Sequence, residues 1–276
     1  MKNLQDFFGM TGRVVIITGG TGLLGQRHAE AIASAGGIPV LADVRSGEVD
    51  PREPAFVERF GEAASAVAVD VTDPNSIRAA LKDVLGRYGR VDGLINNAAN
   101  NPKMESGSAV EFSRLESFGL DQWEADLAVG LTGAFLCSQI IGGEMARRRR
   151  GVIVNVASDL AVIAPDQRLY RQPELPEDRQ PVKPVTYSVV KTGLIGLTRY
   201  LATYWADAGV RVNAISPGGV RQGQPEEFVE RLANLIPLGR MAQVDEYQGA
   251  ILYLCSDASS YMTGTNLIVD GGRTCW

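Results

Sequence analysis

The sequence is poor in the residues from which metal centres and disulfide frameworks are built. Its 276 residues include one histidine and three cysteines, and Cys137, Cys255 and Cys275 lie far apart along the chain. Because there is neither a CxxC pair nor a group of histidines, we expect no bound metal and no Cys–His nucleophile. Three such cysteines are typical of reduced thiols in an intracellular protein.

An excess of basic charge is also missing. Lysine and arginine total 27 against 32 aspartates and glutamates, which gives a net charge of −5. A nucleic-acid partner would require a strongly basic face, so we expect none. The one basic run, Arg147–Arg150, precedes an expected strand, where cations complement the negative end of a helix.

Long apolar runs are absent as well. Residues 1–13 contain no hydrophobic stretch of the kind found in signal peptides. The longest uncharged stretch, Leu127–Gly143, is short for a membrane span and includes Ser138 and Gln139. We therefore expect no membrane association and a cytoplasmic protein, in which this stretch packs against a sheet or a second subunit.

The chain does contain a regular alternation of short apolar segments and longer helical ones. The expected strands are Arg13–Thr18, Ile38–Asp43, Ser65–Asp70, Gly93–Asn96, Val152–Ala157, Val210–Ile215 and Asn266–Val269. The expected helices are Gly22–Ala35, Asn75–Tyr88, Gln122–Arg149, Tyr187–Ala208 and Gln243–Ser256. This alternation predicts an α/β fold, a doubly wound parallel sheet of about seven strands with helices on both faces in three αβα layers.

Two irregular segments interrupt this pattern within a single expected domain over residues 1–276. Residues 160–184 are rich in proline and glutamine, and residues 217–240 include an expected helix around Pro225–Ala233. Long irregular segments in compact domains are often binding loops. We expect the first to form a lid-like insert and the second a substrate-binding loop and helix.

A glycine-rich turn follows the first expected strand and opens a helix. It reads Thr18-Gly-Gly-Thr-Gly-Leu-Leu-Gly25. Glycines here let the backbone approach a pyrophosphate, and the helix N-terminus faces its negative charge. A plain strand-to-helix turn also uses glycine, but the context favours a Rossmann-type dinucleotide site.

The next strands end in residues suited to the rest of a dinucleotide. Asp43 can accept hydrogen bonds from the adenosine ribose and would repel a 2′-phosphate, so we predict NAD rather than NADP. A capping aspartate is the alternative interpretation of Asp43, and the nearby Arg45 would weaken the preference. Asp70-Val71 and Asn96–Ala99 end the third and fourth strands, where a ligand can approach.

A tyrosine and a lysine share one face at the start of a later helix. Tyr187 and Lys191 are four residues apart, so a phenol that moves a proton would lie near an ammonium that lowers its pKa. Ser158, after the fifth strand, can donate to a substrate oxygen or cap a helix. Tyr-x-x-x-Lys also occurs by chance on surface helices, and the preceding cofactor elements favour a catalytic pair.

In this order the motifs resemble the short-chain dehydrogenase/reductase family, in its short single-domain branch. The matching pieces also include Pro217-Gly218 and Val269-Asp270-Gly271-Gly272. The resemblance implies an NAD(P)-dependent oxidoreductase that interconverts a secondary alcohol and a ketone by hydride transfer, with Ser158, Tyr187 and Lys191 as catalytic residues. The positions assigned to the cofactor are Gly19, Thr21, Gly22, Leu24, Gly25, Asp43, Asp70, Val71, Asn97, Ala98, Ala99, Tyr187, Lys191, Pro217, Gly218 and Val220.

Two positions depart from the usual pattern of that branch. The glycine spacing TGxxGxxG, with Leu23 in place of a glycine, resembles the longer branch of sugar-nucleotide epimerases and dehydratases. That branch adds a C-terminal domain, which we do not expect here because the chain ends soon after its last expected strand. Gly130 stands where the family usually has an asparagine that holds a water in its proton relay, so backbone carbonyls would hold that water or proton transfer would be slower.

The substrate is less determined by the sequence. Ser158 and Tyr187 are 29 positions apart, about twice the usual separation, and the insert between them carries four charges of each sign: Arg168, Arg171, Arg179 and Lys183 against Asp166, Glu174, Glu177 and Asp178. Arginines from it could clamp a carboxylate or phosphate, or the insert could be a solvated loop. The polar insert motivates a sugar or sugar derivative as the substrate hypothesis.

Other functions and the assembly also remain open at this stage. An epimerase or dehydratase that uses bound NAD transiently fits the glycine spacing, and a non-catalytic NAD-binding protein fits Gly130. By analogy with the family, the uncharged face of Leu127–Gly143 and the helix that begins at Tyr187 predict a homotetramer or homodimer.

Overall fold

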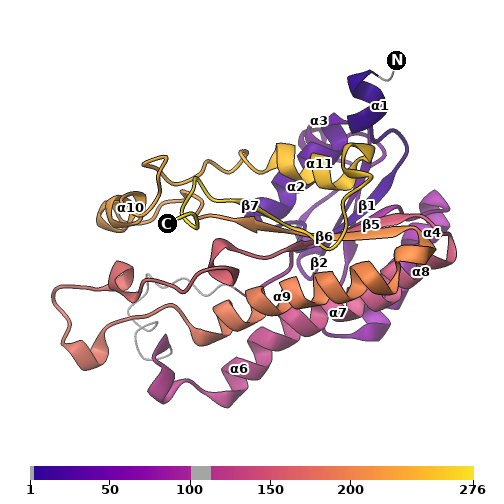
Figure 1. The fold of residues 1–276 in the computed structure, drawn as a ribbon. Coiled ribbons are helices and arrows are strands. Elements are labelled where there is room, and N and C mark those ends of the chain that lie inside the picture. The colour runs from indigo at the N-terminus through magenta and orange to yellow at the C-terminus, as the bar shows by residue number, and fades with distance from the viewer. Residues whose placement is uncertain (1–2, 101–112) are drawn as a thin grey trace.

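The computed structural model describes residues 3–100 and 113–276, and its centre is one parallel sheet (Figure 1). The strands lie in the order β3-β2-β1-β4-β5-β6-β7. They are β1 (Val14–Thr18), β2 (Ile38–Asp43), β3 (Ser65–Ala68), β4 (Gly93–Asn96), β5 (Gly151–Val156), β6 (Val210–Pro217) and β7 (Asn266–Val269). The predicted fold class, with its seven strands, is confirmed. The order reverses between β1 and β4, where ligands bind in sheets of this kind.

The strands are apolar on both faces because helices cover both. Successive side chains of β1 alternate between the faces: Val14 and Ile16 belong to one hydrophobic cluster, Val15 and Ile17 to the other. All five residues of β1 are buried. Such continuous burial is typical of a central strand in a parallel sheet.

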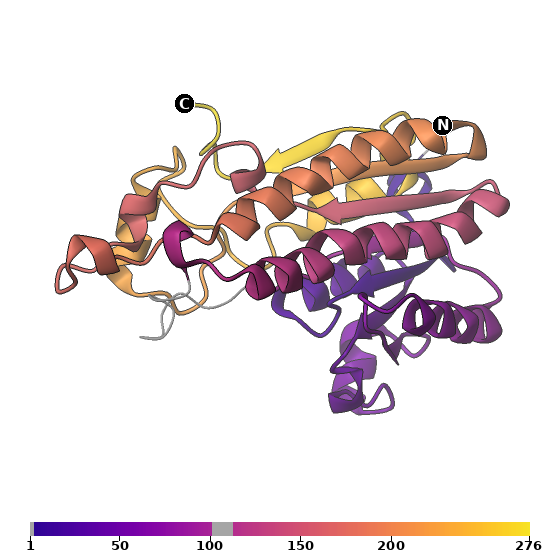
Figure 2. The ribbon, with the colours of Figure 1, turned by 90° about the horizontal axis from the view of Figure 1, so that it is seen from below.

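The helices form two layers, seen from two sides in Figures 1 and 2. Helices α4 (Pro74–Tyr88), α6 (Leu120–Leu127), α7 (Gly133–Cys137), α8 (Gly143–Arg147) and α9 (Val185–Tyr204) cover one face. Helices α2 (Leu23–Ser34) and α11 (Gln248–Cys255) cover the other, and α1 (Leu4–Phe8), α3 (Pro54–Phe60) and α10 (Glu226–Ala233) lie at the periphery.

Two differences from the expected helices have local causes. The helix predicted over Gln122–Arg149 is interrupted by π-helical turns at Ala128–Thr132 and Ser138–Gly142. The helix predicted from Gln243 begins at Gln248 because the Glu246 carboxylate accepts the Gln243 amide at 2.8 Å, which holds this segment in a turn. The short helices α1 and α3 were not predicted.

Helices α6 to α8 together form the long apolar segment Leu120–Arg147. Length and composition alone would allow it to cross a membrane, but the core helix of a soluble protein meets the same criterion. Cys137, Ile141 and Met145 from this segment are buried in the cluster beneath the sheet. The expected packing against the sheet is therefore present.

The two irregular segments lie together beyond the carboxyl ends of the strands (Figure 1). Leu169 of the insert shares a small hydrophobic cluster with Val229 and Leu232 of α10. The rings of Tyr170 and Phe228 are 5.7 Å apart. These contacts join the insert to the 217–240 segment along the rim of the sheet.

Candidate active site

The glycine turn after β1 is tightly packed and leaves a helix N-terminus open. Gly19 has φ +62°, and a Cβ on Gly25 would lie 2.2 Å from the carbonyl oxygen of Gly19. Helix α2 then starts at Leu23 with no side-chain cap and no acidic residue in its first turn. Its free amides therefore suit an anionic group, as the pyrophosphate of a dinucleotide requires.

Asp43 is fixed at the end of β2 beside this turn. Its Oδ2 accepts hydrogen bonds from the amide of Thr21 at 3.2 Å and from its hydroxyl at 2.7 Å. Its Oδ1 accepts from the amide of Arg45 at 3.0 Å, and the Arg45 Nε lies 3.8 Å away. The carboxylate is thus held rigidly with one partly exposed cation near it.

The predicted cofactor positions lie mostly along one cleft of about 690 Å³. It is lined by Gly19, Gly22, Leu24, Asp43, Asp70, Val71, Asn97, Ala98, Ala99, Tyr187, Lys191, Pro217, Gly218 and Val220. Thr21 and Gly25 do not line it; Thr21 braces Asp43, and Gly25 packs under the turn. A dinucleotide fits this volume and donor set, since binding clefts commonly measure about 300–1,000 Å³.

The predicted catalytic residues lie at the other end of the same cleft. Tyr187 and Lys191 are one turn apart on α9, and the Lys191 Nζ donates to the carbonyl of Val156 on β5 at 2.8 Å. This bond holds the ammonium 5.9 Å from the centre of the Tyr187 ring. Helix α9 and strand β5 together therefore set the distance between the two groups.

Ser158 was predicted either to donate a hydrogen bond to a substrate oxygen or to cap a helix. It follows β5, lines the cleft and caps a short 3₁₀ turn by accepting the Leu160 amide at 3.2 Å. Its hydroxyl donates to the Asp159 Oδ1 at 2.8 Å. The capping role and the position beside Tyr187 are therefore compatible.

The pKa of Tyr187 is shifted in the opposite direction from the one expected. Burial raises the pKa of the Tyr187 phenol, and Ser158 and Arg273 oppose this only in part, so the pKa is not lowered as predicted. Burial also lowers the pKa of Lys191 to about 8, with a contribution from the nearby Lys183 ammonium. Desolvation disfavours the charged form of each group.

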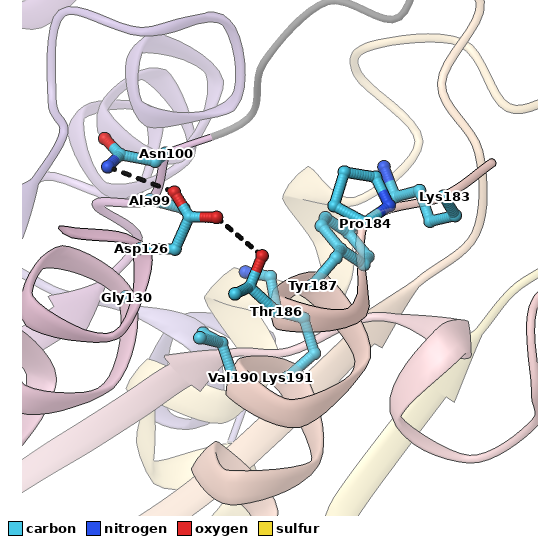
Figure 3. Close-up of a pocket in the computed structure, with 10 residues that line it drawn as sticks. All are labelled: Ala99, Asn100, Asp126, Gly130, Lys183, Pro184, Thr186, Tyr187, Val190 and Lys191. Atoms are coloured by element: carbon cyan, nitrogen blue, oxygen red, sulfur yellow. Dashed lines mark hydrogen bonds between the residues drawn. The ribbon is translucent and has the colours of Figure 1, made fainter. Parts of the chain in front are cut away.

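Figure 3 shows a small cavity between α9 and the long apolar helix, to which Gly130 belongs. Gly130 is one of the residues that line this cavity. A Cβ on Gly130 would lie 2.6 Å from a Val190 methyl, so a larger residue does not fit unless Val190 moves. The cavity measures about 20 Å³, enough for one water. Polar side chains line the cavity in addition to backbone atoms. The Asp126 carboxylate accepts one hydrogen bond from the Thr186 hydroxyl at 2.5 Å and one from the Asn100 amide at 3.4 Å.

Several cleft residues were not among the predicted site residues. Arg273, near the C-terminus, forms a buried ion pair with Asp159 at 2.7 Å, and both line the cleft. Tyr170 also lines it, and burial raises the pKa of its phenol to about 12. Asp159 is adjacent to Ser158, but only the fold brings the C-terminal tail to it.

The insert reaches the cleft through other residues than its arginines. Leu169, Tyr170 and Lys183 line the cleft. Arg168 pairs with Asp166, and Arg171 with Glu177, both among exposed groups. Gln222 of the second segment also lines the cleft.

The described residues contain no group of three or more histidine, cysteine, aspartate or glutamate side chains that could hold a metal ion. Cys137 and Cys255 are buried, and burial raises the pKa of each thiol to about 12. These thiols are therefore inert as nucleophiles near neutral pH.

Comparisons with known proteins agree with this arrangement. The family model described as short chain dehydrogenase matches residues 13–170, and the one described as enoyl-(acyl carrier protein) reductase matches residues 178–274. A D-threitol dehydrogenase of Mycolicibacterium smegmatis is 32% identical over 98% of this chain and 96% of its own. An NAD-dependent glycerol dehydrogenase of Listeria innocua is 31% identical over 99% and 98%.

A solved structure is also closely similar. A gluconate 5-dehydrogenase from Burkholderia cenocepacia, crystallised with NADP and tartrate, superposes with a TM-score of 0.85 and 28% identity. The match covers 99% of this chain and 100% of that one. The similarity thus extends over both ends of the cleft.

Proposed function

Because this chain belongs to the short-chain dehydrogenase/reductase family and is an oxidoreductase of CH–OH groups that uses a nicotinamide cofactor, we propose that it interconverts a secondary alcohol and a ketone in a polyol or sugar derivative. The observation that carries the proposal is the single cleft joining the open N-terminus of α2 to Ser158, Tyr187 and Lys191. Relatives named for threitol and glycerol support a polyhydroxylated substrate.

A nicotinamide cofactor held along this cleft would supply the hydride chemistry, and the chain's own residues move the proton. Tyr187 exchanges a proton with the carbinol oxygen as general acid and base. Ser158 turns its hydroxyl from Asp159 toward that oxygen, and the Lys191 ammonium stabilises the phenolate as it forms. The raised pKa of Tyr187 makes this stabilisation necessary.

NAD is the proposed cofactor in preference to NADP. The Asp43 carboxylate is fixed where the family binds the adenosine ribose, and its charge opposes a 2′-phosphate. Relatives of both cofactor types exist. Arg45 is 56% exposed and pairs with Asp43 only at 3.8 Å, so this cation beside the carboxylate reduces the preference.

The assembly and location are part of the same proposal. We propose a cytoplasmic homotetramer or homodimer in which α9 and the long apolar helix pair between subunits. Phe135 and Val189, on these two helices, are exposed apolar residues. Sedimentation at several concentrations would measure the assembly.

The decisive test is the substitution Tyr187→Phe, with Tyr170→Phe as its matched control. Tyr187→Phe should abolish turnover of polyols, by at least about 10²-fold as expected for a lost general acid–base, while NAD binding measured by fluorescence titration is retained. Tyr170→Phe should keep most activity. Persistent turnover in Tyr187→Phe would show that the proton role is misassigned.

The same assay separates the alternatives. A dehydrogenase produces NADH in proportion to the product, whereas an epimerase or dehydratase returns its NAD to the oxidised form and gives no net NADH. A non-catalytic binder would bind NAD and convert none of the polyols or sugars.

A further inference from the structure

Lys183 occupies an unusual position at the end of the insert. It lies four residues before Tyr187, as Lys191 lies four after it. Its Nζ is 3.8 Å from the centre of the Tyr187 ring, closer than the Nζ of Lys191. It lines both the main cleft and the small cavity beside Gly130, and Figure 3 shows it next to Tyr187.

The ammonium of Lys183 has no anionic partner among residues 3–100 and 113–276. No carboxylate in these ranges lies within the 4.0 Å that defines an ion pair. The other cations near it are engaged: Lys191 donates to the Val156 carbonyl, and Arg273 pairs with Asp159. Lys183 is thus a cation at the reacting centre whose hydrogen bonds remain available to a ligand.

The charge of the substrate end of the cleft is positive. Its charged side chains are three cations and one carboxylate: Lys183, Lys191, Arg273 and Asp159. The adjoining small cavity adds the Asp126 carboxylate, which already accepts hydrogen bonds from Thr186 and Asn100, so the balance stays positive. Helix α9 begins two residues after Lys183 with no side-chain cap and no acidic residue in its first turn, which adds to the positive potential. A partly desolvated site of this sign favours an anionic substrate over a neutral one.

We propose that Lys183 binds the carboxylate of a polyhydroxylated acid, so that the preferred substrate is a sugar acid rather than a neutral polyol. This inference rests on the proposed function, because it assigns the substrate class of that same site. A carboxylate fits better than a bulky phosphate dianion because Asp159 already neutralises Arg273 and Lys191 already donates to the Val156 carbonyl. Lys183 is then the one ammonium at this end of the cleft for which the described residues provide no hydrogen-bond acceptor.

The ionisation of Lys183 gives the site a characteristic pH dependence. Burial lowers the pKa of Lys183 to about 8, while the charge of Asp159 raises it. At neutral pH the group is therefore mainly the ammonium, and above pH 8 it loses the charge that holds the acid. Burial also lowers the pKa of Lys191 to about 8, so the contribution of Lys183 is the decline in acid affinity that Lys183→Arg removes. As the pH rises through this range, affinity for a sugar acid should fall more than affinity for a neutral polyol.

The experiment compares two matched ligand pairs, gluconate with glucitol and threonate with threitol. Equilibrium binding by calorimetry in the presence of NADH and steady-state oxidation with NAD are both measured. The variants are wild type, Lys183→Met, which keeps an unbranched side chain one atom shorter and removes the charge, and Lys183→Arg, which keeps the charge. Thermal melting of each variant confirms that it is folded.

The wild type should bind the acids at least about tenfold more tightly than the polyols. Lys183→Met should weaken acid binding about 10- to 100-fold, the range for a hydrogen bond to a charged group, through KM more than kcat. Polyol binding should stay within about twofold of wild type. Lys183→Arg should restore acid binding and remove its decline above pH 8, because arginine stays protonated.

Two results would overturn the inference. One is equal binding of acids and polyols by the wild type. The other is an equal loss with both ligand types in Lys183→Met together with a shifted pH profile of kcat, which would mean that Lys183 acts on the Tyr187 phenol instead. A failure of the proposed function would look different. The acids would then bind to wild type through Lys183, but NAD would not oxidise them.

Discussion

Asp43 is the side chain on which the proposed preference for NAD depends. Both of its oxygens already accept hydrogen bonds from Thr21 and Arg45, so its position is fixed before a ligand arrives. A fixed charge discriminates better than a mobile one, because it cannot turn away from a second anion.

The variant Asp43→Asn tests this discrimination. It keeps the shape and removes the charge, so the ratio of kcat/KM for NAD over NADP should fall about tenfold or more, mainly because NADP improves. Asp70→Asn is the matched control in the same cleft and should change both nucleotides alike. An unchanged ratio in Asp43→Asn would refute the assigned basis for NAD preference.

At the scale of the element, α2 has an uncapped N-terminus at the cleft and, further along, a buried histidine that lowers the stability of the fold. Its N-terminus is left open at the cleft, while His28 is fully buried on the same helix with both ring nitrogens unpaired. Burial lowers the pKa of His28 from 6.5 to about 4. An unpaired buried polar group reduces stability.

His28 therefore makes the stability of the protein depend on pH. In the unfolded chain His28 becomes protonated below pH 6.5, whereas in the folded chain it stays neutral until the pH falls to about 4. Stability from this group is complete above pH 6.5, and about 3 kcal/mol is lost as the pH falls to 4. Urea unfolding at several pH values measures this slope.

The variant His28→Leu should be more stable than wild type at acidic pH and should lose this part of the slope. His28→Gln is polar but does not titrate, so it should also lose the slope, while remaining less stable than His28→Leu at every pH because its buried amide is unpaired. An identical slope in wild type and both variants would assign the acid sensitivity to other groups.

At the scale of the whole molecule, the C-terminal tail is tied by an ion pair to the segment that follows β5. Arg273 and Asp159 are 114 positions apart, and both are buried where they meet. Asp159 also accepts the Ser158 hydroxyl, so the tail contributes to the placement of a proposed catalytic group. The position of the C-terminal tail therefore affects the position of Ser158 through Asp159.

Removing one partner of this pair should be much worse than removing both. Arg273→Met leaves a buried carboxylate unpaired and should cost about 3–5 kcal/mol of unfolding free energy. The double variant Asp159→Asn/Arg273→Met should recover most of that loss in urea unfolding at neutral pH. If the two variants were equally unstable, the ion pair would not be the cause.

The sequence by itself determined the fold class and the position of the cleft. Apolar strands alternating with helices allow few other arrangements, and parallel strands bring residues at their carboxyl ends, such as Asp43, Asn97 and Ser158, to one edge. Tyr187 and Lys191 are local too, since one helical turn relates them. Local periodicity and local spacing are therefore sufficient for these features.

Only the tertiary structure decided which charges reach the reacting centre. The tail brings Arg273 to Asp159, the return of the insert brings Lys183 over Tyr187, and the arginines of the insert pair with neighbouring acids instead. The same holds for the raised pKa of Tyr187, because burial outweighs the Ser158 hydrogen bond and the charge of Arg273, which lower it. Burial and long-range contacts depend on the packing of distant segments, which no local pattern encodes.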